Sequence, residues 1–233
     1  MKATPAWLLS ALLLALPFTA PPSFAAEPSP ATAPPPVWRP PVVGAPESRI
    51  GGASRGAQAP LILAVLAPDR GVGLTRNARP TVYWYVSKAL ARPLEVTLID
   101  DHAIKPQVET PVTVSRPGIH ALRLDYPLKP GVEYRWSVAA VADPGQRAGD
   151  TLASGTIQHA PPDAALAARL DRASPRELPF LYAEHGYWYD AIATLSARIA
   201  AHPEDRELRT WRAALLKQVG LGEVAAHDLG VRP

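Results

Sequence analysis

The feature that most constrains the fold is a series of short apolar runs between residues 61 and 158, with turn-forming residues between them. In several runs apolar and polar side chains alternate, so that Tyr134, Trp136 and Val138 share one face. Alternation with a period of two is typical of strands that bury one face, and many short strands indicate a β-sandwich or a barrel. The seven predicted strands are 61–67, 81–86, 94–99, 108–114, 119–124, 133–142 and 151–158.

One local motif distinguishes a sandwich from a barrel. Residues 128–134, Leu-Lys-Pro-Gly-Val-Glu-Tyr, resemble the tyrosine corner of fibronectin type III and related immunoglobulin-like sandwiches. In that corner the tyrosine begins a core strand, and its hydroxyl bonds to a backbone group just upstream. The resemblance favours a sandwich. Pro111, within the run 108–114, predicts that this run is an edge strand.

After these runs the apolar spacing changes to that of helices. Asp163 can cap a first helix, and Ser174 followed by Glu177 is a capping box for the next one. Gly186 suits the left-handed position that ends a helix. The helices predicted next cover about 188–201 and 204–218.

The first residues, 1–25, are predicted to be a signal peptide. Lys2 gives a positive start, residues 8–16 form a short apolar run, and small residues precede a cleavage site after Ala25. We therefore expect an exported protein that is periplasmic or secreted. No later segment is long and apolar enough to be transmembrane.

Residues 26–60 are rich in proline and glycine and are predicted to be a linker. They would be followed by an immunoglobulin/fibronectin III-like β-sandwich domain at 61–160 and an α-helical domain at 161–233. The predicted fold class is α+β.

The overall charge and the absence of cysteine exclude several classes of protein. There are 24 Lys and Arg against 21 Asp and Glu, a balance too even for a nucleic-acid-binding surface. Without cysteine there is no disulfide framework, no thiolate metal site and no thiol nucleophile.

The sequence also lacks a recognisable catalytic motif. The six histidines are scattered, and no Gly-x-Ser-x-Gly elbow is present. Asp100-Asp101-His102 directly follows a predicted strand, where aspartate commonly makes a turn. We predict no catalytic residue, no cofactor and no metal, and we do not expect an enzyme.

Residues 143–150 form a glycine-containing loop in which Asp143 and Asp150 flank Arg147. Two carboxylates on a flexible loop can wrap a calcium ion. Arg147 competes for the same carboxylates, so the favoured prediction is a hairpin fastened by an Asp–Arg contact, and ion binding stays open as the alternative.

Four tyrosines are the candidate partner-binding residues. Tyr83 and Tyr85 lie on the strand face opposite Trp84, where they form either a sugar-stacking platform or, as we favour, the surface that receives the helices. Tyr187 and Tyr189 lie at the turn between two helices. Tyrosine is a frequent interface anchor, and packing within the chain is the favoured alternative for this pair.

The stretch of about 34 residues that ends near Pro203 resembles one tetratricopeptide repeat. Pro179 and Arg198 depart from the repeat pattern. Because a solenoid needs about three repeats to bury a continuous face, the resemblance implies a hairpin that packs on the β-module or on a partner. The matching residues are Tyr182, Gly186, Ala191, Leu195 and Pro203.

Five pieces of sequence, in order, resemble a bacterial envelope family known as domain-of-unknown-function family 928. The most specific piece is 181–191, Leu-Tyr-Ala-Glu-His-Gly-Tyr-Trp-Tyr-Asp-Ala. The resemblance implies export and the two-part layout, and it assigns no reaction. The other pieces are 51–56, 74–75 with 79–85, 134–136 and 143–150.

Together these observations predict an exported, non-enzymatic envelope protein. We expect an interaction or accessory module of a secretion or signalling system, with a protein partner in the envelope. The alternative is a carbohydrate- or peptidoglycan-binding module that uses exposed aromatic side chains. A nucleic-acid partner is not expected.

Overall fold

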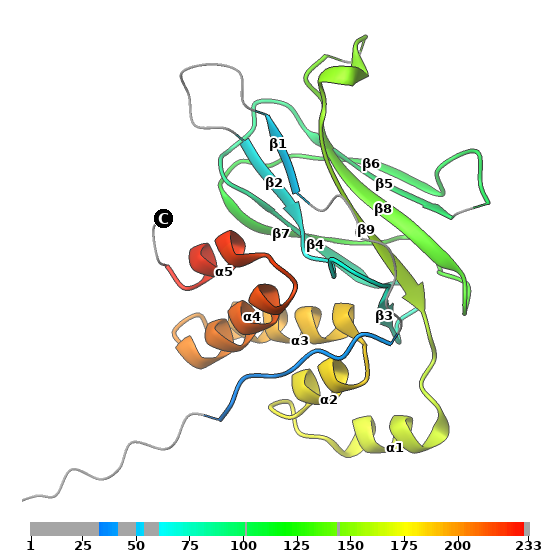
Figure 1. The fold of residues 1–233 in the computed structure, drawn as a ribbon, viewed down its shortest axis with the longest axis vertical. Helices are drawn as coiled ribbons and strands as arrows, with labels where there is room; N and C mark the ends of the chain where they lie inside the picture. The colour runs from blue at the N-terminus through cyan, green and yellow to red at the C-terminus, as the bar shows by residue number, and fades with distance from the viewer. Residues whose placement is uncertain (1–32, 42–49, 54–60, 101, 144, 231–233) are drawn as a thin grey trace, which may run out of the picture. The chain divides into compact units, whose positions relative to one another are not determined.

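The computed structural model describes residues 33–41, 50–53, 61–100, 102–143 and 145–230. The predicted signal peptide and much of the predicted linker lie outside these residues. From Pro34 onward the chain forms one compact unit. It is an α+β protein in which two sheets are followed by helices (Figure 1).

Two sheets make up the β part of the described chain. All neighbouring strands run antiparallel except β3 and β9, which are parallel. The four-stranded sheet has the order β1 (Ile50–Ala53), β2 (Leu61–Val65), β4 (Thr81–Val86) and β7 (Gly118–Arg123). The five-stranded sheet has the order β3 (Gly73–Thr75), β9 (Thr151–His159), β8 (Glu133–Ala140), β5 (Leu94–Asp100) and β6 (Val108–Val112).

The alternation seen in the sequence buries one face of the central strands. Trp84 of β4 and Trp136 of β8 are fully buried. The two sheets come very close at Gly155, because a Cβ atom there would lie only 2.4 Å from the Cβ of Ala67. Only glycine fits this crossing, so its place in β9 fixes how closely the sheets pack.

The hydrogen bond predicted for the tyrosine at the start of β8 is present. The backbone N–H of Lys129 donates to the hydroxyl of Tyr134 over 3.2 Å. β6 lies at the edge of its sheet, which confirms the position predicted from Pro111. The predicted strand 81–86 is observed with the same bounds, and the other predicted strands differ at their ends.

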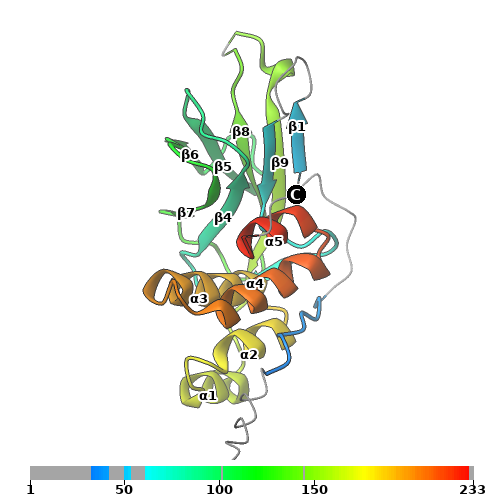
Figure 2. The same ribbon diagram turned by 90° about the vertical axis from the view of Figure 1, so that its left-hand side faces the viewer.

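Five α-helices follow the sheets, and Figure 2 shows them gathered toward one end of the strands. From α2 onward, each helix packs on the next. A short 3-10 turn, Arg147–Gly149, precedes β9. The helices are α1 (Ala164–Arg172), α2 (Leu178–Glu184), α3 (Trp188–Ala201), α4 (Arg206–Gln218) and α5 (Gly222–Asp228).

The predicted helix 188–201 is observed with the same bounds, α4 begins two residues later than predicted, and the predicted capping contacts are present. The Asp163 carboxylate accepts from the N–H of Leu166 over 2.8 Å and caps α1. Ser174 and Glu177 exchange the hydrogen bonds of a capping box just before α2. Gly186 has a φ of +80°, the left-handed conformation that ends α2.

The predicted linker 26–60 is wrong for its two described parts. Residues 50–53 form strand β1, and residues 34–41 lie against the helices. Strand β1 was not predicted because it contains glycines and shows no alternation of apolar and polar side chains. Glycine is required at position 51, since a Cβ atom there would lie 2.5 Å from the Leu152 carbonyl oxygen. Strand β3 and helix α5 were likewise not expected, because both are short.

Candidate functional site

The piece 181–191 joins the helices to the sheets. The indole Nε1 of Trp188 donates to the Leu66 carbonyl oxygen over 2.8 Å. The Tyr189 hydroxyl accepts from the Trp136 indole over 2.8 Å and donates to the Thr156 carbonyl oxygen over 2.7 Å. These buried bonds join the start of α3 to both sheets, because Leu66 directly follows β2 and Trp136 and Thr156 belong to the other sheet.

Asp190 completes this connection on the side of β3. Its carboxylate accepts from the backbone N–H of Arg76 over 2.9 Å. Burial raises the pKa of the Asp190 carboxyl to about 6, against the opposing effect of hydrogen bonds from Arg76 and Thr75. The Leu74 N–H also donates to the Gly186 carbonyl oxygen over 3.1 Å, so the hairpin turn itself bonds to the β part.

The four candidate tyrosines lie mostly inside the chain. Tyr187 is 5% exposed and Tyr189 is 1% exposed. Tyr85 is 5% exposed, and its ring lies 5.0 Å from that of His227 in α5. Tyr83 is half-buried and lines a cavity against α3 and α4. Because helices cover Tyr83 and Tyr85, these rings do not form an open stacking platform. A role in partner binding stays a prediction for all four.

An extended segment lies on the helices on another side. We call residues 34–41 the strap. The Trp38 ring meets that of Trp188 edge-on, with 5.3 Å between centroids. The Arg39 N–H donates to the Ala183 carbonyl oxygen over 3.0 Å, and Pro41 lies directly against Gly186. The strap therefore contacts both helices of the α2–α3 hairpin.

A glutamine at the end of α4 holds the strap by its backbone. The side-chain amide of Gln218 accepts from the Trp38 N–H and donates to the Pro36 carbonyl oxygen, each over 2.9 Å. Because both hydrogen bonds go to backbone atoms, Gln218 binds this extended segment independently of its side chains. Trp38 adds a large aromatic side chain to the contact. We call the strap-bound surface of α2, α3 and α4 the helical face.

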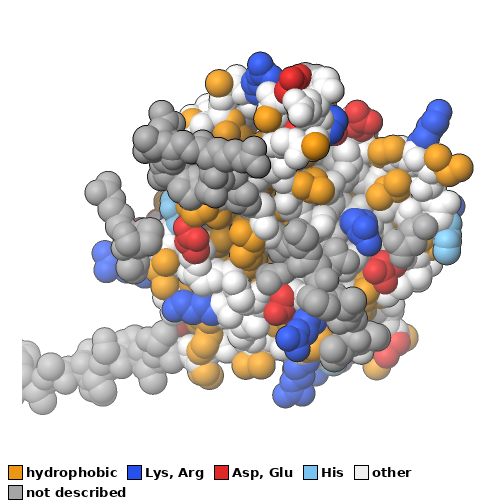
Figure 3. All heavy atoms as spheres, turned by 45° about the horizontal axis from the view of Figure 1, so that its top comes forward, with side chains coloured by type: hydrophobic (Ala, Val, Ile, Leu, Met, Phe, Trp, Pro, Cys, Tyr) orange, Lys and Arg blue, Asp and Glu red, His pale blue; other side chains and the backbone are white. Residues whose placement is uncertain are grey.

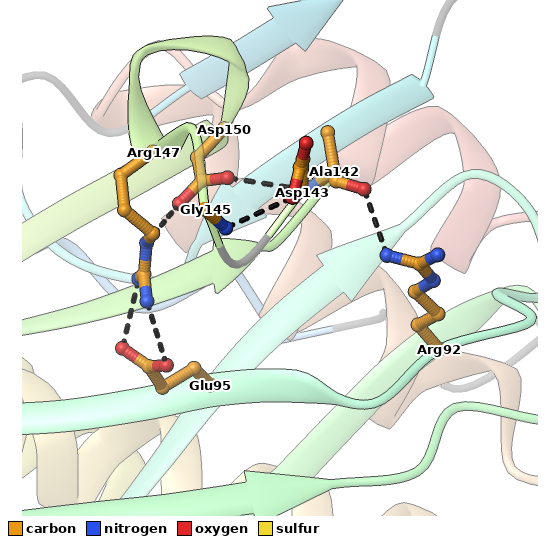
Figure 4. A network of polar contacts seen from close by, with 7 residues as sticks. All are labelled: Arg92, Glu95, Ala142, Asp143, Gly145, Arg147 and Asp150. Carbon is orange, nitrogen blue, oxygen red and sulfur yellow. Dashed lines mark hydrogen bonds and ion pairs between the residues drawn. The ribbon is translucent and has the colours of Figure 1, made fainter.

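The loop 143–150 forms a polar network with the neighbouring strands (Figure 4). The Arg147 guanidinium donates to Asp150 over 2.6 Å and to both carboxylate oxygens of Glu95 over 3.0 and 3.2 Å. Asp143 accepts instead from the Gly145 N–H. The predicted Asp–Arg contact is confirmed, and Arg147 occupies the carboxylate that an ion would need.

The turn after β5 forms as predicted. Asp100 accepts from the N–H of His102 over 2.9 Å.

Within the described ranges no three His, Asp or Glu side chains gather as metal ligands. No helix in the same ranges is long and apolar enough to cross a membrane. On the face in Figure 3, charges of both signs are interspersed with apolar side chains.

The family comparison agrees with the pieces of sequence that meet in this structure. The model named Domain of Unknown Function (DUF928) matches residues 50–229. This chain belongs to the DUF928 family. The match covers both sheets and the helices, and the strap lies outside the matched residues.

Likeness to solved structures is slight. A structure of astrotactin-2, a vertebrate-specific perforin-like membrane protein, is 13% identical over 74% of this chain, with a TM-score of 0.27. The chain spans 36% of the length of that structure. A multi-domain immunophilin from Arabidopsis thaliana is 10% identical, covers 82% of this chain and 98% of its own, and has a TM-score of 0.18. No curated protein matches the chain.

Sequence reasoning missed the strap and the residue that holds it. The available signal was Trp38, a large aromatic within a run of prolines that otherwise indicates a solvated spacer. Gln218 gave no signal, because a glutamine at the end of a helix is usually solvated.

Proposed function

We propose that this chain is an exported, non-enzymatic protein of the cell envelope that binds an extended segment of another protein on the helical face. The observation that carries the proposal is the strap. It occupies this face through backbone hydrogen bonds and one aromatic anchor, as a bound peptide does.

We also propose a class for the two sheets and for the α2–α3 hairpin. We infer an immunoglobulin-like sandwich from the parallel β3–β9 pair, the order β9-β8-β5-β6 and the Tyr134 corner. We infer a tetratricopeptide-like hairpin in α2 and α3, since Gly186 makes the turn and Ala191 is fully buried at the helix contact. Helix pairs of this kind present surfaces suited to extended peptides.

In the proposed mechanism the strap competes with the partner. A segment tethered to its own binding face acts at an effective concentration in about the millimolar range. A partner therefore binds well only if it contacts more of the face than the strap does, or if the strap is drawn away. The strap keeps the face covered when no partner is present.

Photocrosslinking in cells tests this proposal. A photoreactive amino acid at His185, an exposed residue beside the strap contact, should trap one discrete protein adduct. Trp38→Ala should raise the yield, because it weakens the competing strap. The same photoreactive residue at Ile104, exposed on the β5–β6 loop, is the matched control and should not trap that adduct.

Two results would contradict the proposal. One is an adduct that forms equally from residues 185 and 104, which would indicate random collision. The other is a yield at 185 that Trp38→Ala does not change or lowers. Reproducible catalytic turnover by the purified chain would separately contradict its non-enzymatic character.

A further inference from the structure

A second candidate site lies away from the strap. The helices leave a cavity of about 590 Å³ against the side of β4 and β7 that carries Tyr83. Its walls come from α3, α4 and α5 on one side and from the two strands and the loop before β7 on the other. This volume lies within the range of about 300–1,000 Å³ that small-molecule sites occupy.

The lining carries an excess of positive charge. Arg116 projects from the loop before β7, and Arg209 and Arg212 from α4. The carboxylate in the same lining is that of Asp228, in α5. Three guanidinium groups against one carboxylate leave a formal charge of about +2, and the low-dielectric walls of a cavity concentrate such a field.

The ion pair inside the cavity is fixed by the fold. Arg212 donates to both oxygens of Asp228 over 2.8 and 2.6 Å and to the Ser196 hydroxyl over 2.8 Å. The Asp228 side chain is only 2% exposed. Arg212 and Asp228 therefore neutralise each other and form a rigid wall, as expected of a bidentate pair.

The excess charge thus resides on Arg209 and Arg116. Arg209 lies 3.6 Å from an Asp228 oxygen that Arg212 already binds more closely. Arg116 has no carboxylate within ion-pair distance among the described residues, and its side chain is exposed at the cavity rim. Both guanidinium groups keep donors available for an incoming anion.

A neutral hydroxyl lies beside these cations. Burial raises the pKa of Tyr83, although Arg212 and a hydrogen bond with Ser196 act in the opposite direction. The phenol therefore stays protonated. His227 and apolar side chains that include Ile119 and Ile199 complete the lining, so the cavity combines polar and cationic groups with apolar surface.

We propose that this cavity binds a small molecule that carries an oxyanion, either a carboxylate or a phosphate. Arg116 and Arg209 contact the anion, and Tyr83 lies against the neutral part of the ligand. This site is separate from the helical face, so it concerns a second ligand and does not depend on the proposed peptide binding.

Calorimetric titration of the intact chain tests the proposal with three probes of similar size. They are D-glucuronate, D-glucose 6-phosphate and uncharged D-glucose. At least one charged sugar should bind at millimolar concentration or below, and glucose should bind at least about tenfold more weakly. Binding should weaken as salt is added, because added ions screen the two arginines. The charged sugar that binds more tightly identifies the anion.

Substitutions locate the site. Arg116→Gln and Arg209→Gln should each weaken binding of the charged sugar by about tenfold or more, the loss expected for one charge-assisted contact. Arg123→Gln, in an exposed position of β7 outside the cavity lining, is the matched control and should leave the affinity unchanged. Arg116 is exposed on a loop, so its variant should fold.

Three outcomes overturn the proposal. They are the absence of binding by both charged sugars at millimolar concentration, binding of glucose as tight as that of the tighter charged sugar, and equal losses in Arg123→Gln and Arg116→Gln. None of them bears on the helical face, so the two proposals stand or fail separately.

Discussion

Tyr189 is the residue on which the joint between helices and sheets depends most. Its hydroxyl accepts from the buried Trp136 indole and donates to the Thr156 carbonyl oxygen. Tyr189→Phe leaves the indole N–H buried without this acceptor, and the free energy of unfolding should fall by about 2 kcal/mol. Urea denaturation measures this loss.

A second tyrosine gives the matched control. The Tyr182 hydroxyl makes a longer, 3.4 Å bond with the Arg76 guanidinium. Tyr182→Phe should therefore cost less than about 1 kcal/mol. Equal losses of unfolding free energy in the two variants would show that the hydroxyl of Tyr189 stabilises the fold no more than that of Tyr182.

Asp190 should make stability depend on pH. Its folded-state pKa is raised from 3.8 to about 6, so between these values the folded chain binds more protons than the unfolded chain. Stability from this group is present at low pH and is lost as pH rises through about 6. Each pKa unit corresponds to about 1.4 kcal/mol, which gives a total of about 3 kcal/mol.

The measurement is the difference in unfolding free energy between the wild type and Asp190→Asn across this pH range. The wild type should gain relative to the variant as pH falls from 7 to 4. A flat difference would show that the pKa of Asp190 is the same in the folded and unfolded chains, and a slope of the opposite sign would show that folding lowers it; either result would contradict the prediction.

At the scale of elements, the turn between α2 and α3 also positions the strap. Gly186 has a φ of +80°, and a Cβ there would lie 2.9 Å from the ring of Pro41. Gly186→Ala should therefore lower the free energy of unfolding by about 1–2 kcal/mol and loosen the strap. Thermal unfolding reports the first effect, and proteolysis within the strap reports the second.

Gly222 is the matched glycine for this test. It begins α5, and an added Cβ meets nothing within 4 Å. Gly222→Ala should leave stability unchanged or slightly higher, because alanine favours helices. If both substitutions had the same effect, the turn conformation of Gly186 would not explain its loss.

Elements with a strong periodic pattern were predictable from the sequence. The alternation around Trp84 gave β4 with its bounds, and the Ser174 capping box located the start of the helical hairpin. Strand β1 was not predictable, because Gly51 is dictated by a neighbouring backbone and carries no side chain to alternate. The strap was not predicted because its prolines are equally typical of a solvated spacer. Its partner Gln218 is also 180 residues away in sequence from Trp38, so no local pattern links the two.

At the scale of the whole molecule, helices and sheets should unfold together. Trp188, Tyr189 and Asp190 all bond to the β part, so neither part keeps its buried polar partners alone. Tryptophan fluorescence and far-UV circular dichroism should give one coincident urea transition. Two separated transitions would show that the β part and the helices are independent.

The central claim is that the helical face binds an extended peptide, and a titration with the strap itself tests it most directly. A chain that begins at residue 42, checked for folding by circular dichroism, is titrated with a labelled peptide of residues 34–41, Pro-Pro-Pro-Val-Trp-Arg-Pro-Pro. We predict saturable binding that falls about tenfold or more when the peptide carries Trp38→Ala, because this half-buried aromatic side chain anchors the contact. Absence of binding to the folded chain, or equal binding of both peptides, would contradict the account.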